Sequence, residues 1–153
     1  LAGTGLTYHH VGGGSEEDIA TIQAHAASKG VELVVEPRLS QEALVSLVKR
    51  ARAVVSLARG EPFGLTPIEA QAAGTPALMV NEGGYRYTIE DGVTGRLLPR
   101  GDWSVWHAAL EDARDTDTRG AWSEAGRKNI AKMGLRPEEQ AATLASIIDK
   151  LRE

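Results

Sequence analysis

Short apolar runs alternate with helical patterns along most of the chain. The runs predict five strands, at residues 6–11, 31–35, 53–57, 77–80 and 95–98. Apolar positions that share one face predict helices at residues 16–29, 40–51 and 66–73. Residues 102–153 are predicted as a helical C-terminal region of three segments, with breaks near residues 117–118 and 134–137.

Strand–helix–strand repetition with short links favours a parallel sheet that helices cover on both faces. The pattern therefore predicts an α/β fold with a Rossmann-like, doubly wound parallel sheet. Ligands of such sheets bind at the carboxyl ends of the strands, where the strand order reverses. No internal linker or repeat stands out, so we predict a single domain over residues 1–153.

Composition and charge exclude several classes of protein. The net charge of -4 and the absence of a long basic run argue against a nucleic-acid partner. The chain has no cysteine, which excludes disulfides and thiolate metal sites and fits a cytoplasmic location. No apolar run approaches the ~18 residues that a membrane span needs, so we expect no transmembrane segment. The first residue is Leu1 rather than methionine, which fits a piece of a longer chain.

The segment at residues 56–74 carries the candidate chemistry. A strand leads into a loop, and Thr66 is the predicted N-cap of the helix that follows, with Pro67 at the first helical position. Glu69 comes three residues after Thr66, which is the spacing of a capping box. We expect the helix start to direct free N–H groups and the positive end of its dipole at the loop, which suits a phosphate. Gly64 would let the backbone approach a ligand closely.

Each of these residues also has a purely structural explanation. Glu69 taken alone is explained as a helix cap, and Phe63 as a side chain that fills the core. Glu61 lies in a loop flanked by glycine and proline at the carboxyl end of a strand, where ligands bind in this class of sheet. Without further context, Glu61 is equally well explained as a site carboxylate or as a solvated loop charge.

A longer string of residues resembles the retaining, GT-B-fold glycosyltransferases of family 4, also called glycosyl transferases group 1. Glu61 and Glu69, with seven residues between them, match the paired-glutamate signature of that family. The surrounding short motifs match as well: Glu-Pro-Phe-Gly-Leu at residues 61–65, Ala-Ala-Gly-Thr-Pro at 72–76, Gly-Gly at 83–84 and Glu-Asp-Gly-Val-Thr-Gly at 90–95. The resemblance extends from about residue 8 to about residue 102 and implies the C-terminal, donor-binding half of that fold.

The resemblance implies a role for each matching position. Glu61 would contact the donor sugar near the reacting centre, and Glu69 would accept hydrogen bonds from the ribose hydroxyls. Contacts to the donor sugar and the phosphates would come from Phe63, Gly64, Leu65, Thr66, Gly12 and Gly13. The residues beside the nucleotide base would be Glu36, Pro37, Arg38 and Leu39.

The resemblance also implies the chemistry. Members of this family transfer a sugar, here expected to be a hexosyl group, from a nucleoside diphosphate sugar with retention at the anomeric carbon. Basic side chains and helix N–H groups stabilise the leaving diphosphate, so we expect neither a metal nor another cofactor. Asp115-Thr116-Asp117 spells the Asp-x-Asp of metal-dependent transferases, but its place in the helical region favours a solvated turn.

Two parts of the complete enzymes are not matched. The first strand and helix of the donor domain, with the Arg and Lys that hold the diphosphate, have no counterpart before Leu6, and Arg59 is a weaker local candidate. The N-terminal acceptor domain is not matched either, so we expect it in cis or in trans. We therefore predict that the isolated chain of 153 residues has no meaningful transferase activity.

Several other signals favour structural explanations. The adjacent His9 and His10 point to opposite faces of a strand and are not expected to share a metal. Tyr85 and Tyr87 follow the glycine pair near the expected site, although packing explains them better than substrate contact. Helical spacing predicts one packing face from Trp103, Trp106 and Leu110, and a partly exposed stripe from Leu144, Ile147, Ile148 and Leu151.

Two alternatives to a glycosyltransferase fragment stay open. One is a non-catalytic nucleotide-binding or interaction module with the same fold. The other is a different enzyme of the GT-B type, such as a sugar epimerase or a phosphorylase. The intact pair of Glu61 and Glu69 favours the glycosyltransferase, whereas the unmatched Arg and Lys leave the binding module open.

Overall fold

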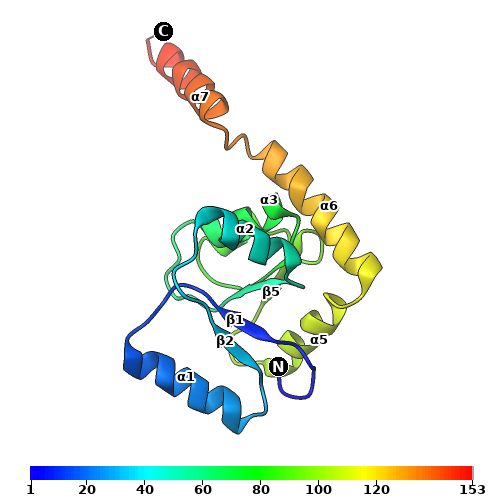
Figure 1. Ribbon diagram of the computed structural model, residues 1–153. Coiled ribbons are helices and arrows are strands. Elements are labelled where there is room, and N and C mark those ends of the chain that lie inside the picture. The colour runs from blue at the N-terminus through cyan, green and yellow to red at the C-terminus, as the bar shows by residue number, and fades with distance from the viewer. Residues whose placement is uncertain (153) are drawn as a thin grey trace. The chain divides into compact units, whose positions relative to one another are not determined.

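The structure is a computed structural model and describes residues 1–152 (Figure 1). Its elements are β1 (Tyr8–His10), α1 (Glu16–Ser28), β2 (Leu33–Val35), α2 (Gln41–Arg50), β3 (Val54–Ser56), α3 (Leu65–Ala73), β4 (Ala77–Val80), α4 (Tyr85–Thr88), β5 (Gly95–Leu98), α5 (Trp103–Asp112), α6 (Thr116–Lys132) and α7 (Pro137–Lys150). The chain forms two compact units, Leu1–Ser46 and the residues from Leu47 onward. Parallel strands alternate with helices in both units, which confirms the predicted α/β class. The single-domain interpretation stays a prediction.

The first unit pairs β1 with β2 in parallel, with Tyr8 opposite Leu33. The capping box predicted for α1 is confirmed: the Asp18 N–H donates to Ser15 Oγ at 3.1 Å, and the Ser15 N–H donates to Asp18 Oδ2 at 3.2 Å. The hydrogen bond from the Ser15 hydroxyl lowers the pKa of Asp18 below its ordinary value. Gly30 follows the helix with a φ of 63°, a conformation that favours glycine and ends the helix as predicted.

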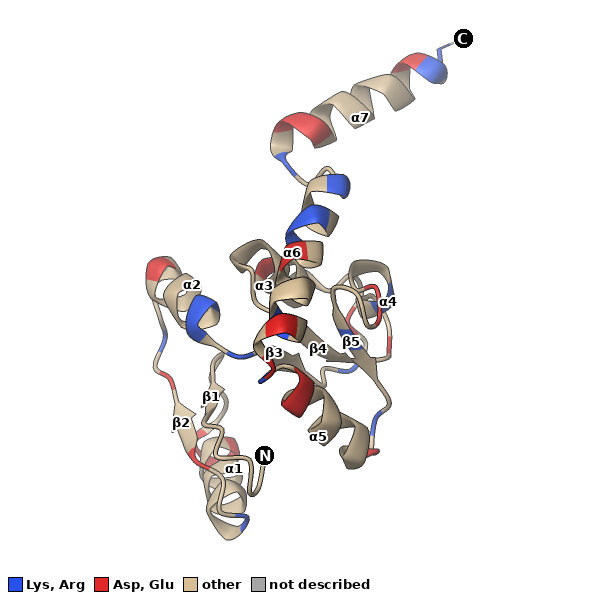
Figure 2. Cartoon of the chain, turned by 90° about the vertical axis from the view of Figure 1, so that its right-hand side faces the viewer, with Lys and Arg blue, Asp and Glu red and all other residues tan. Residues whose placement is uncertain are grey.

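The second unit contains a parallel sheet with the strand order β3-β4-β5 (Figure 2). The central strand β4 is fully buried, with 0% exposure at Ala77, Leu78, Met79 and Val80. An unbroken apolar run is typical of a strand that is covered on both faces. Around it, α3 packs against β3, β4 and α6, while α5 packs against β5. The apolar core of the second unit therefore centres on β4.

Two features of the second unit differ from the prediction. Residues 85–88 form α4, which the sequence pattern did not indicate because four residues are too few to show a helical period. The break before α6 lies at residues 113–115 rather than at 117–118, because Asp115 is the N-cap and accepts a hydrogen bond from the Thr118 N–H at 2.8 Å. The solvated turn predicted there is therefore a helix start. The predicted break before α7 is confirmed.

The predicted packing face of α5 is only partly present. Trp106 is 6% exposed, and its indole N–H donates to the Pro99 carbonyl at 2.9 Å. Leu110 packs against the core from a partly buried position. Trp103, in contrast, is 63% exposed, because it occupies the first helical position directly after the cap Asp102, one turn before the buried face begins. The expectation that Trp103 packs is therefore wrong.

The apolar stripe on α7 is exposed, as predicted. Its members keep 44% to 82% of their surface accessible, and they are Leu144, Ile147, Ile148 and Leu151. Figure 2 shows charged residues at both ends of α7 and an uncharged stretch between them. Among residues 1–152, no helix combines the length and the apolar composition that crossing a membrane requires.

Candidate functional site

The loop between β3 and α3 holds Glu61 in a defined position. The carboxylate oxygen Oε1 accepts hydrogen bonds from the backbone N–H of Gly64 at 2.9 Å and, at a longer 3.4 Å, from that of Phe63. The backbone carbonyl of Glu61 accepts a third bond, from the Gly84 N–H at 2.8 Å. A carboxylate has about four acceptor positions, so the group keeps capacity for ligand hydroxyls after these contacts.

The turn after β4 approaches this loop very closely. A Cβ atom at Gly83 would lie 2.5 Å from the Glu61 carbonyl oxygen, and a Cβ atom at Gly84 would lie 2.4 Å from the Cα of Phe63. Real side chains do not tolerate such distances, so the approach requires glycine at both positions. The Gly-Gly pair of the sequence signature therefore serves backbone packing around Glu61.

The start of α3 differs from the predicted one. The helix begins at Leu65, with Gly64 as N-cap at a φ of 92° and no side-chain cap. Thr66 is therefore not the N-cap, Pro67 is the third helical residue rather than the first, and the proposed capping box between Thr66 and Glu69 is absent. The left-handed conformation of Gly64 makes the turn into the helix, and the first-turn N–H groups of α3 have no side-chain cap. The Thr66 hydroxyl belongs to an exposed residue in the first turn.

The predicted donor residues of the second unit lie in one continuous segment. Gly64 is buried and Glu61 is partly buried, whereas Thr66 and Glu69 are exposed. Phe63 is 42% exposed and Leu65 is 61% exposed, so Phe63 does not fill the core and that structural explanation is wrong. Two carboxylates, the first helical turn and two apolar side chains thus lie within residues 61–69, which follow the carboxyl end of β3.

A buried polar network joins α3 to α4 and α6. The Gln71 side chain is 1% exposed and donates to the Thr88 carbonyl at 2.7 Å. Asn129 of α6 donates to Gln71 Oε1 at 2.9 Å and to the same carbonyl at 3.2 Å. Because buried polar groups are costly unless they are paired, this network specifies one arrangement of α3, α4 and α6.

The two tyrosines after the glycine pair differ in role. Tyr85 is 1% exposed, and its hydroxyl is 2.8 Å from Ser56 Oγ, which joins α4 to β3. Its structural explanation is therefore supported. Tyr87 is 80% exposed and does not belong to the core, so packing does not explain it.

Six of the predicted site residues belong to the first unit. Gly12 and Gly13 follow β1 with φ values of 127° and 84°, and the Gly13 carbonyl lies 2.9 Å from His10 Nε2. Glu36 follows β2, and its Oε1 lies 2.6 Å from His9 Nδ1. The remaining three form the segment Pro37, Arg38 and Leu39, of which Leu39 is partly buried. Their assembly with Glu61 into one site stays a prediction.

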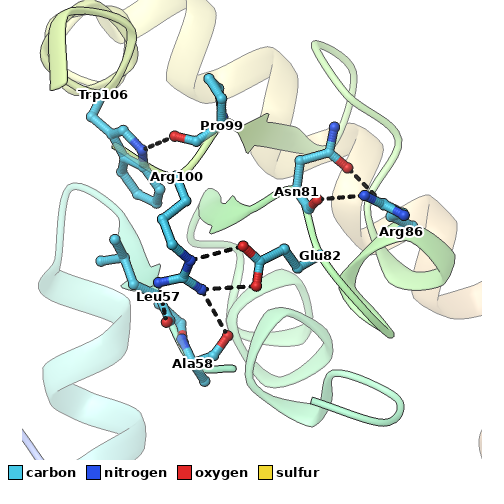
Figure 3. Close-up of polar contacts among 9 residues, drawn as sticks. Leu57, Ala58, Asn81, Glu82, Arg86, Pro99, Arg100 and Trp106 are labelled. Atoms are coloured by element: carbon cyan, nitrogen blue, oxygen red, sulfur yellow. Dashed lines mark hydrogen bonds and ion pairs between the residues drawn. The ribbon is translucent and has the colours of Figure 1, made fainter. Parts of the chain in front are cut away.

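Polar contacts at the ends of the three strands are a feature that the sequence did not indicate (Figure 3). Arg100 donates from Nε and Nη2 to the two carboxylate oxygens of Glu82, at 2.8 and 2.9 Å. The same guanidinium donates from Nη1 to the Leu57 carbonyl at 3.0 Å and from Nη2 to the Ala58 carbonyl at 3.5 Å. In the sequence, only the acidic residue directly before the glycine pair, Glu82, could have indicated these contacts.

Possible metal ligands do not gather in the structure. Within residues 1–152 there is no group of three or more His, Cys, Asp or Glu side chains placed to hold a metal ion. His9 and His10 each contact a different partner, Glu36 and Gly13. Asp115 caps α6, and the hydrogen bond from the Thr118 backbone lowers the pKa of that carboxyl below its ordinary value.

Comparison with solved structures supports the Rossmann-like fold of the C-terminal half of GT-B proteins. The chain superposes on sucrose-phosphate synthase from Thermosynechococcus elongatus with a TM-score of 0.78 and 22% identity, covering 94% of this chain and 37% of that one. It superposes on Anabaena HepE, solved with UDP-glucose, with a TM-score of 0.65 and 21% identity, covering 86% of this chain and 38% of that one. These similarities show the fold.

The chain belongs to the family of glycosyl transferases group 1, whose model matches residues 4–129. It is similar to the D-inositol 3-phosphate glycosyltransferase of Streptomyces coelicolor, with 35% identity over 143 residues, 90% of this chain and 31% of that protein. The protein of the same name from Corynebacterium diphtheriae is 37% identical over 120 residues, 76% of this chain and 25% of that protein. The chain thus spans about a third or less of the length of these curated relatives.

Proposed function

We propose that this chain is the donor-binding part of a retaining glycosyltransferase that moves a hexosyl group from a nucleoside diphosphate sugar to an acceptor. The observation that carries the proposal is the segment from β3 into α3. It combines a Glu61 carboxylate held by backbone N–H groups with an exposed helix start and the exposed carboxylate of Glu69. Membership of the family and the similarity to named glycosyltransferases support the same conclusion.

Each element of this segment suits one part of the donor. Glu61 would accept hydrogen bonds from sugar hydroxyls near the reacting centre, because its orientation is already set by Gly64. The first turn of α3, with Leu65 and Thr66, would bind phosphate through backbone N–H groups, the Thr66 hydroxyl and the positive end of the helix dipole. Glu69 would bind the vicinal hydroxyls of the ribose, since one carboxylate accepts two donors.

The remaining predicted positions would complete the contacts to the sugar and to the base. Phe63 and Gly64 would contact the sugar and diphosphate. Their N–H groups also donate to Glu61, so the contacts to the donor must either coexist with these hydrogen bonds or replace them. Gly12 and Gly13 would add backbone close to the donor, and Glu36 to Leu39 would lie beside the base.

The mechanism we propose needs no metal and no further cofactor. As the bond between the anomeric carbon and the diphosphate breaks, negative charge develops on the leaving phosphate oxygen. Backbone N–H groups and the dipole of α3 would stabilise that charge, and they are preorganised because Gly64 and the buried Gln71 fix the helix. The acceptor oxygen would then bond to the anomeric carbon on the same face, and its proton would pass to the leaving phosphate oxygen.

Three further parts of the proposal concern the protein around the site. The acceptor domain would be supplied by other residues in cis or in trans, and the isolated chain would bind donor without turnover, since it spans about a third of the relatives' length. The cysteine-free composition favours the cytoplasm. The proposed function involves neither binding to nucleic acid nor a segment that spans a membrane.

Calorimetric titration of the chain with UDP, GDP, ADP and their sugars tests this proposal. We expect one nucleotide to bind, and Glu69→Ala to weaken its affinity roughly 10- to 100-fold, because hydrogen bonds to a charged group are lost. Glu138→Ala, which removes an exposed helical glutamate of α7, is the matched control and should leave affinity unchanged. Unchanged nucleotide affinity in Glu69→Ala would refute the ribose assignment, and no binding by the unaltered chain would refute donor binding.

A further inference from the structure

One guanidinium joins the carboxyl ends of three strands in the second unit (Figure 3). Arg100 follows β5, Glu82 follows β4, and Leu57 and Ala58 follow β3. The Arg100 side chain bonds to both Glu82 oxygens at 2.8 and 2.9 Å and to the two β3 carbonyls at 3.0 and 3.5 Å. A planar guanidinium presents several donors in a fixed geometry, so it can hold these groups at once, whereas an ammonium group cannot reproduce the two-pronged contact.

The contacts of Glu82 favour its charged form. The hydrogen bond from Arg100 is the main cause that lowers the pKa of Glu82, and the positive charges of Arg59 and Arg86 add to it. The side chains are partly exposed, 24% at Arg100 and 38% at Glu82. Exposed ion pairs contribute little to overall stability, so the main consequence of this pair is geometric.

The pair acts at both ends of the segment that carries Glu61. Ala58, whose carbonyl Arg100 holds, lies at the root of the Glu61 loop. Glu82 directly precedes the glycine pair, and the Gly84 N–H donates to the Glu61 carbonyl at 2.8 Å. The Arg100 guanidinium therefore links the root of the loop to the turn that holds the loop's centre.

We propose that Arg100 and Glu82 are positioning residues for Glu61, a role that rests on the proposed donor-binding function. They keep the Glu61 carboxylate aimed at the donor sugar without touching the donor themselves. Four of the five N–H groups of Arg100 donate to protein acceptors, so the orientation of its guanidinium is set by Glu82 and by the root of the loop. Loosening the pair should weaken recognition of the sugar and spare recognition of the nucleotide.

Amide hydrogen exchange measured by NMR on the 153-residue chain tests the positioning directly. In Arg100→Gln and in Glu82→Gln, we expect the amides of Gly84 and Gly64 to exchange roughly tenfold or more faster, because the bonds to Glu61 open more often. The amides of the buried strand β4 should keep their rates. Arg100→Lys should fall between the unaltered chain and Arg100→Gln, since it keeps the charge and loses the two-pronged contact.

Arg96→Gln is the matched control. Arg96 is also an arginine of the β5 region, 31% exposed, and it pairs with Asp91 at 2.9 Å. Within residues 1–152 its ion pairs are with Asp91 and Asp112, not with the Glu61 loop or the glycine turn. Its removal should leave Gly84 and Gly64 exchange unchanged. Equal acceleration in Arg96→Gln, or no acceleration in Arg100→Gln and Glu82→Gln, would overturn the positioning role.

Titration separates this inference from the proposed function. For the nucleotide that binds, Arg100→Gln should lower the affinity for the nucleotide sugar roughly tenfold while changing that for the nucleoside diphosphate less than about twofold. An equal loss for both ligands would show that Arg100 acts on the diphosphate and would overturn the inference. If the unaltered chain binds neither ligand, the proposed function fails, and the exchange rates still decide whether Arg100 and Glu82 hold the loop.

Discussion

Single glycines decide how closely two backbone segments approach around Glu61. Gly84 has no room for a Cβ atom, which would meet the Phe63 Cα at 2.4 Å, and its N–H is needed by the Glu61 carbonyl. Gly120, on α6, has no atom within 4 Å of the position a Cβ would take. The same amino acid is therefore required in one place and dispensable in the other.

Alanine at these two positions should have opposite effects. We expect Gly84→Ala to destabilise the fold by about 1–3 kcal/mol, because the added methyl group forces the loop and the turn apart. Gly120→Ala should stabilise it by about 0.5–1 kcal/mol, since an exposed helical glycine is replaced by a better helix former. Urea unfolding of both variants measures the difference, and a Gly84→Ala protein as stable as the parent would contradict the close approach.

At the scale of elements, the helices begin in different ways. α1 uses the Ser15 side chain, α6 uses the Asp115 carboxylate, and α3 uses a left-handed glycine, Gly64. α6 also carries Trp122, which is 6% exposed and donates to the Gly92 carbonyl at 3.1 Å. The fluorescence of Trp122 should therefore respond when α6 loosens, although the two other tryptophans contribute to the signal.

The Asp115 cap predicts a defined pH dependence. Because the folded protein lowers the pKa of Asp115 below its ordinary value of 3.8, the charged cap stabilises α6 above that value and its contribution is lost as pH falls through the lower folded value. Asp115→Asn keeps a capping oxygen but does not titrate, so this part of the acid dependence should disappear while neutral-pH stability stays close to the parent. Thermal unfolding at pH 7 and between pH 4 and pH 2 measures it, over roughly the range that carboxyl pKa values span. An unchanged acid profile in Asp115→Asn would contradict the prediction.

At the scale of the whole molecule, buried apolar surface is unevenly distributed. The fully buried apolar side chains among the described residues all belong to the second unit, centred on β4. In the first unit the only buried residue is Thr4, at 6% exposure, and its helix α1 has no buried residue. Local stability follows the density of buried contacts, so the two units should differ in resistance to opening.

Hydrogen exchange of the whole chain should therefore proceed in two stages. We expect the amides of β1 and β2 to exchange well before those of β4, because little apolar burial opposes their opening. Mass-spectrometric exchange with peptides from residues 1–46 and from β4 measures this. Equally slow exchange of β1 and β4 would show that the first unit is stabilised to the same degree as the core.

Local sequence signals were sufficient for much of this description. The alternation of strands and helices, the capping box of α1, the buried run of β4 and the exposed stripe of α7 all depend on residues close together in the chain. The first three strands were predicted two or three residues too long, because apolar residues extend beyond the paired positions, whereas β4 and β5 have the predicted bounds. The short helix α4 was missed since one turn leaves no periodic pattern.

The sequence by itself determined the fold class, the family and the segment that contains Glu61 and Glu69, because these depend on local periodicity and on a characteristic order of residues. Only the tertiary structure decided how that segment is held. Gly64 rather than Thr66 starts α3, since the choice depends on the left-handed turn the loop makes. The contact between Arg100 and Glu82 joins residues 18 positions apart and cannot arise until β4 and β5 pair. The contact between the Glu61 loop and the Gly83-Gly84 turn is therefore a product of sheet assembly, whereas the presence of Glu61 is a property of the chain.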